Sequence, residues 1–262
     1  MGTYVMADLH GRFTELNMLL NKVEFSDLDK LIIAGDICDR GKENYEMLRW
    51  MESKPNNVEF IKGNHEEEYI DNINILTRML KEIPNIIVCY RELINKDKFF
   101  DCYGTIWQLI NEHKVTYEQL VRWADMMYEF PYIKELSVNN KNYLIVHAGY
   151  MDMDSIINSP LNGNSSIKEI RFMAQAKEIF CTSARSEALF VGGKRDTTVI
   201  AGHNPTIIKG DFYNSGRILR HERPEINSVI YDIDCGAGFL EKCSIANIAC
   251  IRLEDEKIFY LR

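Results

Sequence analysis

The amino-acid sequence predicts an α/β protein built as a layered sandwich, in which two mixed β-sheets are flanked by helices. Two observations predict this fold class. Short apolar runs alternate with stretches of helical periodicity along much of the chain, and three runs near its end, 229–233, 245–252 and 258–261, alternate in the manner of strands. We expect a hairpin of these C-terminal strands to build the second sheet, which would pack against the first.

The first sheet begins with a strand–helix–strand unit. The apolar run at residues 3–7 ends in Asp8-Leu-His10-Gly, a stretch with apolar residues at helical spacing follows, and a second apolar run at 31–34 ends in Gly-Asp36. Because such a crossover makes its two strands parallel, Asp8 and Asp36 should emerge at the same edge of the sheet.

Three later strands are expected to end at that edge as well. Their apolar runs stop at polar motifs: 58–61 before Gly-Asn64-His65-Glu66, 143–146 before His147-Ala-Gly, and 197–201 before Gly-His203-Asn-Pro. In open α/β sheets, ligands bind outside the carboxyl ends of the strands. The five motifs should therefore converge on one site.

The chain is expected to form a single domain over residues 1–262, with a mainly helical insertion at about 67–130. Apolar residues recur at helical spacing over 69–83, which predicts one amphipathic helix of the insertion. Thr116 and Gln119 have the spacing of a capping box and predict the start of a second helix.

Composition excludes several kinds of protein. An apolar fraction of 46% can bury a large core and excludes a disordered chain. The net charge of −8 argues against nucleic acid as a partner, because a broad grip on a phosphate backbone needs a surplus of Lys and Arg. The sequence has no apolar stretch of about 18 residues and no leader at Met1, so we expect a cytoplasmic protein that binds no membrane.

The five motifs supply the ligand types that Mn, Fe and Zn ions accept, namely imidazole, carboxylate and amide oxygen. One ion is assigned to Asp8, His10 and Asp36, and a second to Asp36, Asn64, His147 and His203, with Asp36 as the bridge. Two divalent cations would leave the site positive and attractive to a phosphate group. Such a pair can lower the pKa of a shared water, orient the phosphoryl group and stabilise the leaving oxygen.

Each motif alone has a simpler interpretation. An isolated Asp-x-His often caps a helix or fills a turn, Asn64 after a glycine is typical of a turn, and His147 after an apolar strand is typical of a core histidine. The combination of five motifs, each at a predicted strand end, favours the metal site.

Three more residues indicate the reaction. His65 stands next to Asn64 and could protonate the leaving alkoxide as general acid, with Asp39 orienting its imidazole. Arg40 can clamp phosphate oxygens with its planar fork, so it is assigned both to catalysis and to substrate binding together with Asn64. The simpler interpretation of Asp39 and Arg40 is an ion pair on a surface turn.

These residues resemble the calcineurin-like metallophosphoesterases. The matching motifs are Asp8-Leu-His10-Gly11, Gly35-Asp36-Ile-Cys-Asp39-Arg40-Gly41, Gly63-Asn64-His65-Glu66, His147-Ala-Gly149 and Gly202-His203. The Asp-Arg-Gly sequence is most similar to the serine/threonine protein phosphatase branch in its compact bacterial and phage form. The resemblance implies a binuclear site with two divalent ions, Mn²⁺ first and Fe or Zn as alternatives. It also implies hydrolysis of phosphoserine or phosphothreonine in a phosphoprotein or small phosphorylated molecule.

The resemblance further implies a second phosphate-binding arginine. Arg185 is our choice because it precedes Gly202-His203 by a plausible distance, and Arg171 and Arg195 are the alternatives. The sequence around Arg185 departs from the family's usual Leu-Trp-Ser type.

Two other functions compete with the phosphomonoesterase. A symmetrical dinucleoside tetraphosphate hydrolase shares most of the scaffold, although that relative tends to lack the Asp that Asp39 provides here. A metal-binding scaffold without catalysis is the alternative of another class, and it would not need a complete set of ligands and acid.

Overall fold

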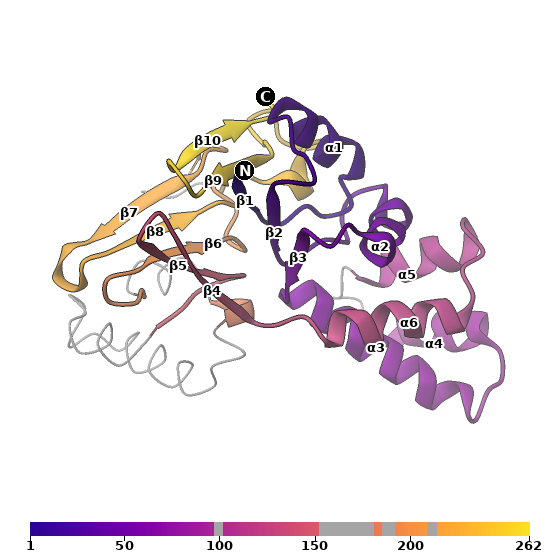
Figure 1. The fold of residues 1–262 in the computed structure, drawn as a ribbon. Coiled ribbons are helices and arrows are strands. Elements are labelled where there is room, and N and C mark those ends of the chain that lie inside the picture. Colours follow the sequence, from indigo (N-terminus) through magenta and orange to yellow (C-terminus); the bar gives the residue numbers. More distant parts are fainter. Residues whose placement is uncertain (97–101, 152–180, 185–191, 209–213) are drawn as a thin grey trace.

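The computed structural model describes residues 1–96, 102–151, 181–184, 192–208 and 214–262, and all structural statements concern these residues. Their strands form two five-stranded sheets, ordered β10-β9-β1-β2-β3 and β4-β5-β6-β8-β7. The predicted fold class, two mixed sheets with helices, is confirmed (Figure 1).

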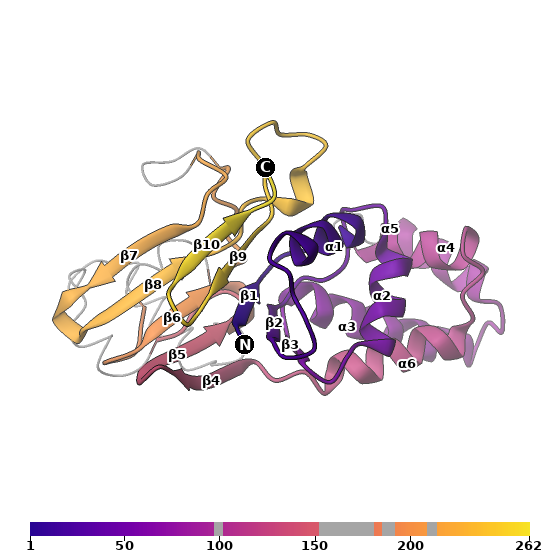
Figure 2. The same ribbon diagram turned by 45° about the horizontal axis from the view of Figure 1, so that its top comes forward.

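Sheet 1 combines three parallel strands with a hairpin. Its members are β1 (Thr3–Met6), β2 (Lys30–Ala34), β3 (Val58–Ile61), β9 (Ala249–Arg252) and β10 (Lys257–Tyr260). β1, β2 and β3 run parallel, as the strand–helix–strand pattern predicts. The β9–β10 hairpin lies antiparallel beside β1 (Figure 2).

Sheet 2 has three parallel strands with an antiparallel strand at each edge. Its members are β4 (Ile133–Val138), β5 (Lys141–Val146), β6 (Thr198–Ala201), β7 (Leu219–Arg223) and β8 (Ser228–Asp232). β5, β6 and β8 are parallel, whereas β4 and β7 pair with them antiparallel. The 3₁₀ turns η1 (Pro224–Ile226) and η2 (Ala237–Phe239) precede and follow β8.

Alternation along the strands divides the core into layers. In β1, Tyr4 and Met6 pack with the helices, whereas Val5 points to the second sheet and packs in one cluster with Ile145 and Ile200. The two sheets therefore meet face to face through an apolar layer, with the helices on the outer face of sheet 1.

The helices gather on one side of the molecule (Figure 1). They are α1 (Phe13–Lys22), α2 (Asn44–Ser53), α3 (Asn64–Leu80), α4 (Ile86–Lys96), α5 (Cys102–Asn111) and α6 (Tyr117–Tyr128). The last four lie between β3 and β4. The predicted cap of α6 is confirmed, because the Thr116 side chain accepts a hydrogen bond from the Gln119 amide at 3.3 Å.

Two predictions about the sheets are wrong. The C-terminal hairpin does not build a second sheet, since β9 pairs with β1 and thereby extends the first. The five strand ends also do not share one sheet, because the strands before His147 and His203 belong to sheet 2. Among the described residues, no helix combines the length and apolar character needed to cross a membrane.

Candidate metal centre and active site

The polar motifs meet where the carboxyl ends of the parallel strands of the two sheets come together. Asp8 and His10 follow β1, Asp36 follows β2, and His203 follows β6. Hydrogen bonds tie these loops to one another: the His10 amide donates to the Asp36 carbonyl at 2.9 Å, and the His203 amide donates to the Asp8 carboxylate at 3.0 Å. Residues from both sheets therefore form one site.

The backbone of this site is strained. Six of its residues have positive φ, between 44° and 73°, a region that residues with a Cβ rarely adopt: Asp8, His10, Asp36, Asp39, Arg40 and His203. The loops also pack very closely, since a Cβ on Gly41 would lie 2.0 Å from the His10 carbonyl oxygen. Strain held by the surrounding fold is typical of functional sites.

A buried carboxylate holds two of these loops together. Glu66, in the first turn of α3, accepts hydrogen bonds from the amides of Asp36 at 3.0 Å, Ile37 at 2.9 Å and Gly63 at 2.7 Å. Burial and the nearby Asp36 carboxylate raise the pKa of Glu66 to about 7. Glu66 thereby fixes the loop after β2 to the start of α3. Its place in the motif is visible in the sequence, but this role is not.

Replacing Glu66 by Gln should destabilise the protein. The amide nitrogen would face a backbone N–H group, so one buried donor would lose its acceptor at a cost of about 2 kcal/mol. For a chain of this size, we expect the melting temperature to fall by about 4–8 °C, measured in EDTA to remove metal linkage. Glu118→Gln, at an exposed position of α6, is the control. An unchanged melting temperature for Glu66→Gln would contradict the proposed role.

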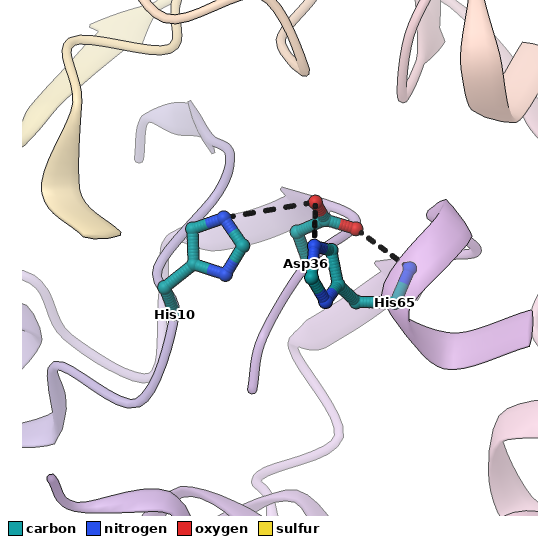
Figure 3. A group of neighbouring side chains, drawn as sticks. All are labelled: His10, Asp36 and His65. Atoms are coloured by element: carbon teal, nitrogen blue, oxygen red, sulfur yellow. Dashed lines mark hydrogen bonds and ion pairs between the residues drawn. The ribbon is translucent and has the colours of Figure 1, made fainter. Parts of the chain in front are cut away.

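Two groups of side chains share Asp36 and can each hold a metal ion. They are His10, Asp36 and His65, and Asp36, His147 and His203, with the donor atoms of each group within 4.8 Å of one another. Figure 3 shows His10 and His65 on either side of the Asp36 carboxylate. Asp36 Oδ2 lies 3.7 Å from Nε2 of both His10 and His65, and Asp36 Oδ1 lies 3.3 Å from His147 Nε2. The arrangement is consistent with a binuclear site.

The hydrogen bonds of the imidazoles fit a metal. Nδ1 of His10 lies 2.8 Å from the Cys38 carbonyl oxygen, and Nδ1 of His147 lies 2.9 Å from the Ala34 carbonyl oxygen. A carbonyl only accepts, so Nδ1 carries the hydrogen and Nε2 presents a lone pair to the site. His147 Nε2 lies 3.1 Å from Asn64 Oδ1, and a cation would satisfy these two acceptors.

The charges of the buried side chains also indicate a metal site. Six carboxylates, each at most 2% exposed, are buried in or beside the site: Asp8, Asp36, Asp39, Glu66, Asp232 and Asp234. Burial and then the Asp234 carboxylate raise the pKa of Asp8 well above its usual range. Burial lowers the pKa of His10 and His147, and that of His203 to about 3, so these imidazoles are neutral as metal ligands must be. The donor set and the excess of buried negative charge both fit divalent cations.

Asp8 has a different environment from the other predicted ligands. It is outside the two donor groups, and both of its carboxylate oxygens accept from the His203 amide, at 3.1 and 3.0 Å. Asp8 as a ligand stays a prediction. Asp234 was not predicted, although its carboxylate is buried near Asp8, and the Tyr231-Asp-Ile-Asp234 sequence is the only signal for it.

The predicted acid is part of a hydrogen-bonded chain. His65 Nδ1 lies 2.6 Å from Asp39 Oδ2, and the Thr105 hydroxyl donates to Asp39 Oδ1. Burial alone would lower the pKa of His65, but the carboxylates of Asp36 and Asp39 outweigh it and raise the pKa to about 10. The two carboxylates therefore favour the protonated imidazole that a general acid needs. Thr105 belongs to α5, and nothing in the sequence indicates its role.

Arg40 lies between two imidazoles. Its Nη1 is 3.0 Å from His10 Nε2, and its Nη2 is 3.0 Å from His65 Nε2. The side chain is exposed, so a phosphate group can reach the fork. Arg40 thus has the position expected of a phosphate clamp beside the acid.

The second phosphate-binding arginine stays a prediction. Arg185 and Arg171 lie outside the described residues. Arg195 lines a pocket with Asn142 and Thr197, at the amino-terminal ends of β5 and β6. His203 follows the opposite end of β6, so the structure does not bring Arg195 to the metal centre.

Comparison with known proteins gives a family match and a partial match to curated relatives. A family model for calcineurin-like phosphoesterases matches residues 1–232. A symmetrical bis(5'-nucleosyl)-tetraphosphatase of Haemophilus ducreyi is 42% identical over 67 residues, which are 25% of this chain and 25% of that protein. One of Buchnera aphidicola is 42% identical over 71 residues, which are 27% and 26%. The match spans about a quarter of the length of these relatives.

One solved structure has a similar fold over nearly the whole chain. It is assigned as a diadenosine tetraphosphatase, superposes with a TM-score of 0.53, and covers 99% of this chain and 92% of its own. The sequence identity is 15%, so the likeness concerns the fold alone.

Proposed function

The chain belongs to the calcineurin-like phosphoesterase family, and from this premise we propose that it hydrolyses symmetrical dinucleoside tetraphosphates at a two-metal site. The observation that carries the substrate is the match of a quarter of the chain to symmetrical tetraphosphatases. The sequence motifs favour phosphoserine and phosphothreonine as first substrates, whereas the matched relatives favour dinucleoside tetraphosphates. Membership of the serine/threonine phosphatase branch remains a prediction.

Two divalent cations, for which we expect Mn²⁺, would supply an activated water and neutralise the phosphate charge. His10 and Asp36 would hold one of them with Asp8, and the other would be held by Asp36, Asn64, His147 and His203. The neutral imidazoles and the two lone pairs facing each other at His147 and Asn64 support this assignment.

The chain's own residues would act on the phosphate and the leaving group. Arg40 would orient the scissile phosphate with its two terminal nitrogens. His65 would donate its Nε2 proton to the leaving oxygen while Asp39 holds its Nδ1 hydrogen. Water adds to one central phosphate of the tetraphosphate, the bridging oxygen departs with the other, and two nucleoside diphosphates result.

The Asp39–His65 pair favours phosphomonoesters as a second candidate. A serine or threonine alkoxide is a strong base and needs a proton as it leaves. A leaving nucleoside diphosphate ends in a phosphate whose own pKa is about 6, so it gains little from an acid. An acid supported by both Asp39 and Thr105 is therefore of most use with an alcohol leaving group.

The test is a direct comparison of kcat/KM for diadenosine tetraphosphate and a phosphoserine peptide, with Mn²⁺ supplied. We expect the tetraphosphate to be preferred and ADP to be the sole nucleotide product. Preference for the peptide would reverse the substrate assignment. If neither substrate is hydrolysed when Mn²⁺ is supplied, the metal-binding scaffold without catalysis becomes the favoured function.

Substituting Asp39 by Asn gives a second, independent readout. The change removes one of the two carboxylates that raise the pKa of His65, so the pKa falls while Asp36 still raises it. His65 loses its proton as pH rises through its pKa, and with it the ability to act as an acid. The alkaline limb of the kcat profile should therefore move to lower pH. For a phosphoserine peptide at neutral pH, we expect kcat to fall about 10–100-fold, with a small change for the tetraphosphate. Asp125→Asn, on the exposed face of α6, is the control, and a pH profile unchanged in Asp39→Asn would refute the pairing.

A further inference from the structure

A pocket of about 530 Å³ opens beside Arg40, within the size range of small-molecule sites. It lies between the loop after β2, helix α5 and the η2 turn. The side chains that matter for its chemistry are Arg40, Lys42, Trp107, Gln108, Phe239 and Lys242. The sequence gives no motif for it, because its lining comes from three distant segments.

The pocket adjoins the metal centre on the side of the acid. Arg40 lines it and also contacts the Nε2 atoms of both His10 and His65. Thr105 lines it and donates to Asp39, the partner of His65. A substrate whose scissile phosphate lies at Arg40 can therefore extend its leaving portion into the pocket.

The lining is positively charged although the chain carries a net charge of −8. The lining contains three cationic side chains, Arg40, Lys42 and Lys242, and one carboxylate, that of Glu112. Lys42 pairs with Glu241 at 3.0 Å, but the two side chains are 76% and 47% exposed, so this pair is weak. Lys242 has no ion-pair partner among the described residues. The pocket suits an anion larger than one phosphate.

Aromatic rings complete the lining. Trp107 stacks on the buried Tyr90 with ring centroids 5.4 Å apart and an interplanar angle of 19°, which fixes its orientation. The Arg40 guanidinium lies over the Phe239 ring, with Cζ 5.5 Å from the ring centroid. Aromatic side chains next to cations are the combination that binds a nucleobase and its phosphates.

We propose that this pocket binds the leaving nucleoside diphosphate portion of the substrate. Lys42 and Lys242 contact its phosphates, and Trp107 contacts its base. The assignment rests on the proposed function, because a tetraphosphate cleaved in the middle releases such a group on the side of His65.

The test is calorimetric titration of the whole Mn²⁺-loaded protein with ADP, pyrophosphate and adenosine. We expect Lys42→Ala and Lys242→Ala each to weaken ADP binding about 3- to 10-fold. Trp107→Leu should weaken ADP binding while leaving pyrophosphate affinity unchanged. Lys194→Ala, at the pocket that Arg195 lines, is the control.

Several outcomes would overturn the proposal. ADP affinity unchanged in the Lys42→Ala/Lys242→Ala double variant excludes the lysines, and equal loss of ADP and pyrophosphate binding in Trp107→Leu excludes the base contact. Loss of phosphopeptide affinity in place of ADP affinity would assign the pocket to a peptide.

The failure of the proposed function is distinguishable from these results. ADP binding that depends on the two lysines, without hydrolysis of the tetraphosphate, would support the pocket proposal and contradict the proposed function. Tetraphosphate turnover with a KM indifferent to all three substitutions retains the reaction and refutes the pocket.

Discussion

Asp36→Asn should abolish metal-dependent turnover, with a loss in kcat of about 1,000-fold or more, because a bridging metal site contributes several kcal/mol to catalysis. Asp36 is the one carboxylate shared by both donor groups. A neutral amide cannot replace that charge. Metal content after desalting, measured by elemental analysis, should fall from two ions per chain to one or none.

Asp125→Asn, which makes the same chemical change at an exposed position of α6, should keep both metal and activity. Thermal melting in EDTA shows whether Asp36→Asn still folds without relying on metal linkage. Two ions per chain in a folded Asp36→Asn protein would exclude Asp36 as the bridge.

His65→Asn should lower kcat about 10²–10⁴-fold for a phosphomonoester with an alcohol leaving group, the usual contribution of a general acid. The loss should be smaller for p-nitrophenyl phosphate and for a phosphoanhydride, whose leaving groups need less protonation. The measurement is kcat over these three substrate types at saturating Mn²⁺. His113→Asn, on the loop after α5, is the matched control.

Metal content separates the two roles open to His65. Its Nε2 lies in one of the donor groups, 3.7 Å from Asp36, so it could be a ligand instead of an acid. If His65 is the acid, the His65→Asn variant should still bind two metal ions. A His65→Asn protein that binds fewer ions, and that loses activity equally on all three substrates, would identify His65 as a ligand.

The local parts of the site could be predicted from the sequence. Strand ends and the residues that follow them are short-range features, so the positions of His10, Asp36 and His203 follow from apolar runs and the polar motifs after them. The predicted contact of His65 with Asp39 is confirmed by the geometry. These residues lie within a few positions of a strand end, where period and motif are both informative.

Pairings between distant segments could not be predicted. Thr105 meets Asp39 across 66 residues, and α5 has no feature that marks the hydroxyl as a partner. The division into two sheets depends on β9 choosing β1 as neighbour, and apolar alternation does not specify a neighbour. The same limit applies to the Lys42 and Lys242 pocket, whose walls meet only in the folded chain.

The neighbourhood of β1 also bears on the kinetics of folding. Val5, just before Asp8, pairs with Ile251, so one side of the first strand remains unpaired until residues near 251 have been synthesised. Closing a contact of such long sequence separation is slow, and an unpaired strand edge is exposed to wrong partners in the meantime. The loop that carries Asp8 and His10 therefore reaches its final support late. We therefore expect the metal centre to be completed only after the C-terminal hairpin has been synthesised and has paired with β1.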